Sequence, residues 1–363
     1  MTNQAAESTL VYVGTYTPTE GDAKGKAEGI YIDRLQAGSS ALTSIQTITG
    51  VDNPSYLALH PNGRYLYVAE ELIEGRVAAY SIDPASGGLT LLNRLPTHGA
   101  DPAHISVDRD GKWVLVANYT SGNTAVYPIE ADGSVGAPTS LIQHEGSSVD
   151  PDRQEGPHAH YITTDPDNRF VLVADLGIDK IMVYRLDATN GTLTPNDPPW
   201  ATMEPGSGPR HLTFHRNGRY VYVLHELDSS VTVCSYDAER GELMPIQRIS
   251  TLPTGWGGDN TCAAIHLAPT GSFLYCSNRG HDSIAVFAID DTTGMLTYVE
   301  NTLTGGKEPR DFNLHPNGRL LLAGNQNSDT ITSFDVDPAT GRLTATGDSL
   351  PVLTPVCIVF YPG

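Results

Sequence analysis

The stretch HPNGRYLYVAEE, residues His60–Glu71, carries the pattern that decides the fold of this chain of 363 residues. A tight Asn62-Gly63 turn leads into an apolar run, which is the sequence signature of a β-hairpin. The pattern returns at intervals of about 50 residues, the size of one blade of a β-propeller. The further copies are RDGKWVLVANY from Arg109, DPDNRFVLVADL from Asp165, HRNGRYVYVLHE from His215, PTGSFLYCSNR from Pro269 and HPNGRLLLAGNQ from His315.

Each copy is predicted to form four antiparallel strands. In the copy that follows Pro54, SYLALH is the first strand and RYLYVAE the second, and RVAAYSID and GLTLLNRL follow after turns. Apolar and polar residues alternate in these runs, as half-buried strands require. The start of the fourth strand recurs as Gly-x-Leu-Thr at Gly191, Gly294 and Gly341.

A further blade is predicted from the two ends of the chain. Residues 10–48 hold LVYVGTY, GIYIDR and ALTSIQTI, which match the second, third and fourth strands of the repeat. Residues 355–361, PVCIVFY, match a first strand with nothing after it. Joining the ends completes one blade and removes two open sheet edges, and a β-sandwich does not explain these complementary deficits. The predicted fold class is all-β: one seven-bladed β-propeller domain over residues 1–363, with blades 2–7 in residues 54–351.

The composition restricts the partners of the chain. Its formal net charge is −20 and its pI is near 4.8, so phosphate backbones and anionic lipids repel it. We expect no nucleic acid and no membrane as partners, and a monomer or weak homodimer. Cys234, Cys262, Cys276 and Cys357 fit no zinc pattern, so unpaired thiols in a reducing compartment are expected. The first residues, MTNQAAESTL, show neither a basic start nor an apolar stretch, which predicts a cytoplasmic protein without a signal peptide.

Polar residues converge on one predicted mouth of the channel. The first strand of each blade lines a propeller channel and the second runs antiparallel to it, so the start of the first and the end of the second share a face. The long loops Thr17–Glu28 and Gln143–Gly156 open onto that face, and function commonly sits on such loops. The first strands supply His104, His158, His160, Arg210 and Arg310, and the ends of the second strands supply Glu70, Asn118, Asp175, Glu226, Arg279 and Asn325.

Three arginines near one mouth are unusual in so acidic a chain. Arg210, Arg279 and Arg310 predict a local positive patch, and their planar forks suit a carboxylate or a phosphate. Glu226 has an alternative role, because its charge can simply neutralise the arginines. For any single residue, the ordinary polar lining of a wet channel is the alternative.

Four stretches carry a family resemblance: GPHAHYITTDPDNRF, GSGPRHLTFHRNGRYVYVLHELDSSVTV, FLYCSNRGHDSIAVF and PRDFNLHPNGRLLLAGNQ. In them the chain resembles the lactonase family of seven-bladed propellers, which includes propeller-type 6-phosphogluconolactonases and fungal enzymes that cyclise carboxymuconate. The resemblance implies that His158, Arg210, Glu226 and Arg279 are catalytic. One departure bears on the substrate: Ala264 stands where family members often carry an acidic residue.

The function that this resemblance implies is hydrolysis of a sugar lactone, 6-phosphogluconolactone or another anionic aldonolactone. His158 is the expected base, because imidazole exchanges protons near neutral pH. Arginine stabilises the developing oxyanion, and Glu226 either orients Arg210 or His158 or protonates the leaving hydroxyl. No cofactor and no metal are expected. The residues predicted to bind substrate are Arg310, His160, Glu70, His104, Asn118, Asp175 and Asn325.

Other functions stay open at this point. Cycloisomerisation of a muconate would use the same residues, with a general acid delivering the proton. A scaffold propeller would expose apolar anchor residues on one face, and the sequence shows no such concentration. A metal-dependent lactonase would need Glu70, Asn118, Asp175 and Glu226 to hold Ca²⁺ through oxygen ligands, against the charge of the arginines.

Overall fold

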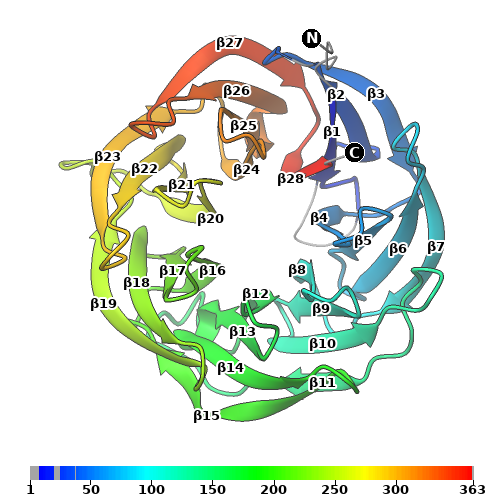
Figure 1. Ribbon diagram of the computed structural model, residues 1–363, viewed down its shortest axis with the longest axis vertical. Helices are drawn as coiled ribbons and strands as arrows, with labels where there is room; N and C mark the ends of the chain where they lie inside the picture. Colours follow the sequence, from blue (N-terminus) through cyan, green and yellow to red (C-terminus); the bar gives the residue numbers. More distant parts are fainter. Residues whose placement is uncertain (1–7, 20–24, 37, 362–363) are drawn as a thin grey trace, which may run out of the picture.

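Strand pairing follows the sequence repeat. A computed structural model describes residues 8–19, 25–36 and 38–361, and within them seven four-stranded antiparallel sheets surround a central channel (Figure 1). The predicted all-β, seven-bladed propeller is therefore confirmed. Residues 1–7 of the N-terminal stretch and residues 20–24 of the first long loop lie outside the described residues.

In each blade the four strands follow one another from the channel outward (Figure 1). Blade 1 contains β28 (Pro355–Tyr361), β1 (Thr9–Thr15), β2 (Gly29–Leu35) and β3 (Leu42–Thr49); blade 2 contains β4 (Pro54–Leu59), β5 (Tyr65–Glu70), β6 (Arg76–Ile82) and β7 (Leu89–Pro96); blade 3 contains β8 (Pro102–Val107), β9 (Trp113–Asn118), β10 (Asn123–Pro128) and β11 (Ser140–Gln143). Blade 4 contains β12 (Ala159–Thr164), β13 (Phe170–Asp175), β14 (Lys180–Asp187) and β15 (Thr192–Thr202); blade 5 contains β16 (Pro209–Phe214), β17 (Tyr220–His225), β18 (Ser230–Asp237) and β19 (Glu242–Ser250). Blade 6 contains β20 (Thr261–Leu267), β21 (Phe273–Arg279), β22 (Ser283–Ile289) and β23 (Leu296–Leu303); blade 7 contains β24 (Pro309–Leu314), β25 (Leu320–Asn325), β26 (Thr330–Val336) and β27 (Leu343–Pro351). Short 3₁₀ turns, η1 (Leu176–Ile178) and η2 (Gln326–Ser328), follow β13 and β25.

The C-terminal strand closes the ring. β28 pairs antiparallel with β1, placing Leu10 opposite Tyr361 and Val13 opposite Ile358. Figure 1 shows the red β28 beside the blue β1, so segments from opposite ends of the chain form one blade. Each strand gains backbone partners that an open edge would lack. The closure predicted from the complementary chain ends is confirmed.

Apolar clusters fill the seams between neighbouring blades. Side chains alternate along a strand, so each second strand contributes to two seams. On β5, Leu66 and Val68 pack against blade 1, whereas Tyr67 and Ala69 pack against blade 3. Because the second strand is buried on both faces, its side chains are held in the two seams. Side chains reach the channel mouth from the ends of such strands.

Tyrosine hydroxyls tie blades together. The hydroxyl of Tyr12 donates to the carbonyl of Gly87 at 2.8 Å, across the seam between blades 1 and 2. Tyr222 donates to the carbonyl of Gly294 at 3.1 Å, across the seam between blades 5 and 6. Gly294 has a φ of 71°, and a Cβ there would lie 2.4 Å from the ring of Tyr220. The glycine that opens the recurrent Gly-x-Leu-Thr motif thus serves the turn and the seam together.

All four cysteines are buried and unpaired, as the sequence predicts. Among the described residues, no helix has the length and apolar character needed to cross a bilayer.

Candidate active site

A cavity of about 420 Å³ opens at the mouth of the channel, where the first strands begin and the second strands end. A smaller space of about 10 Å³ adjoins it, enough for roughly one water molecule. The two share Glu71, Ala103 and Arg310. The residues that line the larger cavity, called the mouth cavity below, are Glu71, Ala103, Tyr119, Arg153, His160, Glu226, Thr261, Arg279, Glu308 and Arg310.

A β-bulge near the start of the first strand aims side chains at this mouth. In blade 5, Pro209 pairs with His225 and His211 pairs with Leu224, which leaves Arg210 as the extra residue. A bulge takes its extra residue out of the ladder and re-aims its side chain. In blades 1, 2, 3, 4 and 7 the same place is held by Val356, Ser55, Ala103, His160 and Arg310.

This register corrects the sequence alignment of blade 4. Ala159 pairs with Asp175, as Pro209 pairs with His225 in blade 5. The counterpart of Arg210 is therefore His160, and not His158. Taking the residue after the proline that opens the other first strands would select His158, but Pro157 and His158 both precede β12, and no local pattern marks this offset of two residues.

His158 lies beside the mouth cavity and not in its lining. Its ring stacks on Tyr119, with centroids 4.6 Å apart and an interplanar angle of 18°. Its Nδ1 lies 3.1 Å from the carbonyl oxygen of Tyr119, and its Nε2 lies 3.2 Å from Oε1 of Glu155. Both ring nitrogens are thus engaged outside the cavity. A catalytic role for His158 stays a prediction.

His160 is the histidine that lines the mouth cavity. Its side chain is buried, and its Nδ1 has no hydrogen-bond partner within the described part of the chain. Burial and the positive charge of Arg210 hold the pKa of His160 well below its usual value, although the charge of Glu226 opposes them. His160 is therefore a neutral imidazole, which can accept a proton.

Glu226 holds three arginines at the mouth. Its Oε2 accepts a hydrogen bond from Nε of Arg210 at 2.8 Å and lies 3.1 Å from a terminal nitrogen of Arg279. Its Oε1 accepts from Arg153 at 2.7 Å. Burial by itself would raise the pKa of Glu226, but the charges of Arg279, Arg210 and Arg153 hold it well below the usual range. Glu226 therefore stays ionised throughout the neutral pH range.

Arg210 lies deeper than the other arginines and lines the smaller space. Burial, together with the charges of Arg279 and Arg310, lowers its pKa to about 9, so it remains positively charged at neutral pH. One terminal nitrogen donates to the carbonyl of Ala263 and lies 3.2 Å from Nε2 of His211. These contacts, with Glu226, fix Arg210 as part of the frame of the site.

Arg310 differs from the other arginines because its charge has no direct partner. Its guanidinium forms neither a hydrogen bond nor an ion pair to the residues described, and it lies over the ring of Tyr16 at 5.2 Å from the centroid. Burial disfavours the charge, but Tyr16, Glu71 and Glu226 together raise its pKa. Arg310 is thus a positioned cation in the lining of the mouth cavity that is available to a ligand.

Four residues predicted to bind substrate point into blade seams instead. They share one place, the last residue of a second strand, and all are buried. Glu70 lies 2.5 Å from Nε of Arg94 and 2.6 Å from Nε of Arg76. Side-chain alternation still applies at the last residue of a strand, so it directs this position toward the neighbouring blade. None of the four, which are Glu70, Asn118, Asp175 and Asn325, lines the mouth cavity.

The other three of these residues support nearby backbone and loops. Asn118 donates to the carbonyl of Thr97 at 3.2 Å, and Asn325 donates to Thr332 at 3.1 Å. Asp175 accepts from the backbone N–H of His158 at 2.7 Å and lies 2.6 Å from Nδ1 of His144. Their contacts are structural, and Asp175 holds the loop that precedes β12.

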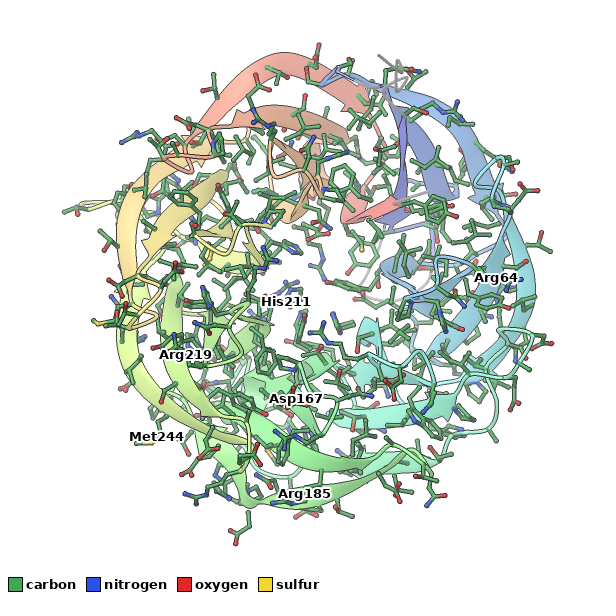
Figure 2. All side chains as sticks on the ribbon, viewed as in Figure 1. Arg64, Asp167, Arg185, His211, Arg219 and Met244 are labelled. Atoms are coloured by element: carbon green, nitrogen blue, oxygen red, sulfur yellow. The ribbon has the colours of Figure 1, made fainter. Side chains whose placement is uncertain are left out.

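His104 lies in a stack of rings inside the channel. Its centroid is 3.9 Å from that of Tyr161 and 4.3 Å from that of Tyr56. His211 joins the stack at 4.9 Å from Tyr161 and meets His160 at 5.3 Å. Figure 2 shows His211 near the centre of the ring, whereas Met244 lies at the outer edge. His104 is absent from the lining of the mouth cavity.

Sequence reasoning missed Arg153, Tyr119 and Glu71 as site residues. Arg153 belongs to the long loop 143–156. The predicted position of this loop on the mouth face was the sequence feature that could have identified Arg153 as a site residue. One of its terminal nitrogens lies 3.3 Å from the hydroxyl of Tyr119. The same nitrogen donates a hydrogen bond to Oε1 of Glu226. Tyr119 and Glu71 each stand one residue beyond the end of a second strand, where the side chain leaves the seam.

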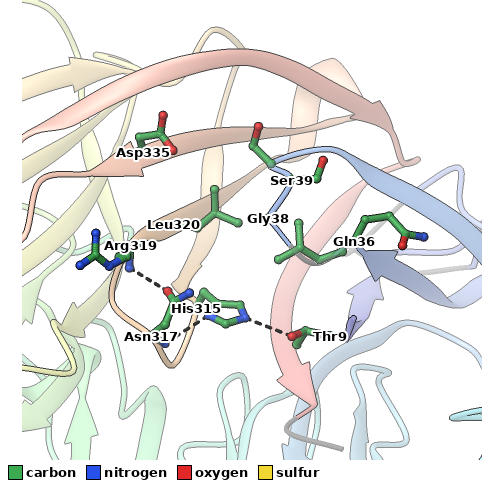
Figure 3. A pocket seen from close by; sticks show the side chains of 11 residues that line it. Thr9, Gln36, Gly38, Ser39, His315, Asn317, Arg319, Leu320 and Asp335 are labelled. Carbon is green, nitrogen blue, oxygen red and sulfur yellow. Dashed lines mark hydrogen bonds between the residues drawn. The ribbon is translucent and has the colours of Figure 1, made fainter. Parts of the chain in front are cut away.

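A cavity of about 550 Å³ lies on the opposite face, at the seam between blades 7 and 1 (Figure 3). Its lining includes Arg319, Asp335 and His315, whose Nε2 lies 3.1 Å from the hydroxyl of Thr9. It adjoins the far ends of β24 and β25, so none of the predicted site residues reaches it.

The oxygen ligands of the metal-dependent alternative do not share a centre. Glu70 faces two arginines in a seam and Glu226 faces three at the mouth. Over the described ranges, no group of three or more His, Cys, Asp or Glu side chains is arranged to hold a metal ion.

Comparisons with known proteins agree with this fold. The family described as "Lactonase, 7-bladed beta-propeller" matches residues 10–360. The 6-phosphogluconolactonase of Bacillus subtilis (strain 168) is 41% identical over 302 residues, 83% of each chain. The solved structure of the periplasmic gluconolactonase of Pseudomonas aeruginosa superposes with a TM-score of 0.91 at 35% identity, covering 98% of this chain and 99% of that one. A Lactobacillus plantarum protein superposes with a TM-score of 0.89 at 35% identity and the same coverage.

The chain belongs to the lactonase family of seven-bladed β-propellers. Several relatives have no assigned activity, among them an uncharacterized protein of Staphylococcus saprophyticus that is 35% identical over 312 residues, 85% of this chain and 86% of that one. The family is therefore established, and the particular substrate is a separate question.

Proposed function

We propose that the chain hydrolyses an anionic aldonolactone, with 6-phosphogluconolactone as the first candidate. The observation that carries the proposal is the composition of the mouth cavity: the unpaired cation of Arg310 and the neutral His160 line one space. The names of the Bacillus subtilis and Pseudomonas aeruginosa relatives support a lactone substrate.

His160 is proposed as the general base. It takes a proton from water as the water oxygen bonds to the lactone carbonyl carbon. The carbonyl oxygen becomes an oxyanion, and Arg279 or Arg153 can stabilise it because their guanidinium groups line the same cavity. The acyl bond to the ring oxygen then breaks, and the product is an open-chain hydroxy acid.

Glu226 is proposed to position the arginines and to carry no proton. Its two oxygens contact Arg153, Arg210 and Arg279. The positive charges of these arginines keep Glu226 ionised. Of the roles considered from the sequence, its contacts favour orientation of Arg210 over proton donation. Arg310 is proposed to hold the phosphate or carboxylate of the substrate, because it is the arginine of the cavity whose charge no described side chain pairs.

A panel of lactones tests the proposal. Purified protein is offered 6-phosphoglucono-δ-lactone, glucono-δ-lactone and an uncharged lactone, and acid release is followed by pH-stat with spontaneous hydrolysis subtracted. We expect the phosphorylated lactone to have the highest kcat/KM. Hydrolysis of none of them above background would contradict the proposal, and cyclisation of a carboxymuconate in a parallel assay would replace it.

Arg310→Ala tests the anion site against a matched control. We expect KM for the phosphorylated lactone to rise at least about tenfold, since a charge-assisted hydrogen bond is worth about 1.5–3 kcal/mol. KM for the uncharged lactone should change little. Arg319→Ala removes an arginine from the opposite face and should leave both values unchanged. An equal rise in KM for both lactones would contradict an anion-binding role.

A further inference from the structure

Glu71 is a second carboxyl of the mouth cavity, and its surroundings differ from those of Glu226. It follows β5 directly and lines both the mouth cavity and the smaller space beside it. Its backbone N–H donates to the carbonyl of Asn53 at 2.9 Å, and its own carbonyl accepts from the side chain of Asn53 at 3.0 Å. The backbone of Glu71 is therefore held on both sides.

The hydroxyl of Tyr16 orients this carboxyl. Tyr16 lies just after β1, in the neighbouring blade, and it is buried. Its hydroxyl oxygen is 2.9 Å from each of the two carboxyl oxygens of Glu71. The ring of Tyr16 also lies under the guanidinium of Arg310. Glu71, Tyr16 and Arg310 form one unit at the cavity wall, which joins three blades.

Among the carboxyls of the cavity, Glu71 and Glu226 have pKa values that are shifted in opposite directions. Glu226 forms ion pairs with three arginines, whereas Glu71 forms no ion pair with any described residue. Burial raises the pKa of Glu71, and Asp101 acts in the same direction. Arg310 and the hydroxyls of Ser55 and Tyr16 oppose that rise without cancelling it. When the pKa values of two titratable groups in one site are driven apart in this way, the group with the raised pKa is suited to be the acid.

We propose that Glu71 is the general acid of the reaction and gives its proton to the ring oxygen of the lactone as that oxygen leaves. The inference rests on the proposed lactone hydrolysis. Water forms a bond to the carbonyl carbon and loses one proton to His160; the acyl carbon–oxygen bond breaks, and the oxygen takes the proton of Glu71. After release of the hydroxy acid, protonated His160 loses its proton to solvent and the carboxylate of Glu71 takes one from solvent.

Arg310 couples substrate binding to this proton. The free cation favours the ionised form of Glu71. An anionic group of the substrate that pairs with Arg310 offsets that effect. Substrate binding therefore favours the protonated form of Glu71, which the departure of the ring oxygen requires. An anionic lactone should therefore show a higher kcat than its uncharged analogue, in addition to a lower KM.

Glu71→Gln tests the proposal with two leaving groups. Hydrolysis of an aldonolactone expels an alkoxide, which needs a proton, whereas dihydrocoumarin expels a phenoxide, which does not. We expect Glu71→Gln to lower kcat about 10²-fold or more on the aldonolactone and only a few-fold on dihydrocoumarin. Tyr16→Phe should show the same selectivity with a smaller loss. Glu74→Gln, three residues further and exposed, is the matched control and should behave as wild type.

Each outcome bears on a different part of the proposal. Equal losses on the two lactones, or wild-type kcat for Glu71→Gln on the aldonolactone, would overturn the role of Glu71. If dihydrocoumarin is not a substrate, the pH profile decides: wild-type kcat should fall on the alkaline side as Glu71 loses its proton, and Glu71→Gln should lack that limb. An unchanged limb in the variant would also overturn the proposal. Wild-type protein that hydrolyses no lactone would instead overturn the proposed function, and circular dichroism with a melting curve establishes that each variant is folded.

Discussion

Glu70 and Glu71 are adjacent in the sequence, and their side chains have opposite surroundings. Glu70 ends β5 and points into the seam, where Arg76 and Arg94 neutralise it. Glu71 follows the strand, lines the mouth cavity and meets the hydroxyl of Tyr16. The same step of one residue separates Asn118 from Tyr119 in blade 3. In blades 2 and 3 the last residue of the second strand holds the frame together, and the next residue lines the cavity.

The comparison predicts that the two groups of positions affect different properties. Changes among the strand-end residues that face seams, which are Glu70, Asn118, Asp175 and Asn325, should lower stability and leave turnover of the folded protein intact. Changes among the residues that line the mouth cavity should lower turnover more than stability.

The largest effect is expected for Glu226→Ala. Removal of this carboxylate leaves Arg153, Arg210 and Arg279 without their shared partner, and breaking a buried ion pair costs about 3–5 kcal/mol. We expect kcat/KM on the best lactone to fall more than about 10³-fold, with a lower melting temperature. Steady-state kinetics and a melting curve measure both. A variant within tenfold of wild type would show that the arginines hold their places without Glu226.

The next effect separates the two histidines of blade 4. His160→Asn removes the imidazole that lines the cavity, so kcat should fall about 10²–10⁴-fold, the usual contribution of a general base. His158→Asn removes a ring that stacks on Tyr119 outside the cavity, and its kcat should fall less. The ratio of the two kcat values on one lactone is the measurement. A larger loss for His158→Asn would restore the assignment that the family resemblance implies.

Glu70→Gln tests the seam side of the comparison. It leaves Arg94 without a countercharge, whereas Arg76 keeps its ion pair with Asp52. Since both arginines are partly exposed to water, we expect a loss at the low end of the usual range, about 3 kcal/mol. Denaturant unfolding should report that loss, while kcat of the folded protein stays at the wild-type value. A large fall in kcat with little change in stability would place Glu70 in the site and break the comparison.

The smallest effect concerns a seam carboxyl without any arginine. Asp33 on β2 is buried, and neither carboxyl oxygen has a hydrogen-bond partner among the described residues. Burial raises the pKa of Asp33 to about 6. Between the pKa values of the unfolded and folded states, the folded state holds a proton that the unfolded chain has already lost, so stability falls progressively as pH rises from the ordinary value of 3.8 to about 6.

Asp33→Asn should remove this dependence. We expect the variant to be about 3 kcal/mol more stable than wild type at pH 8, where the carboxylate would be ionised, and close to wild type at pH 3, below the pKa of the unfolded chain. Unfolding curves at the two pH values measure the difference. Parallel pH dependence in both proteins would mean that Asp33 finds a partner when it ionises.

The sequence by itself determined the architecture and the face that carries the site. The turn before each second strand and the alternation of apolar residues are local, so the repeat can be read directly from HPNGRYLYVAEE and its copies. The closure by β28 was also accessible, because the two chain ends lack complementary strands. The position of Arg210, Arg310 and Glu226 at the mouth was accessible for a similar reason, because equivalent positions in a repeat project to one mouth.

Only the tertiary structure decided which residue at each strand end faces the cavity. A bulge removes one residue from the ladder at Arg210 and Arg310, and in blade 4 that residue is His160 and not His158. Neither the bulge nor the side to which Glu70 and Glu71 turn leaves a mark in the sequence pattern. The direction of a side chain there depends on where pairing with the next strand stops, and that is set by the packing of whole blades against one another.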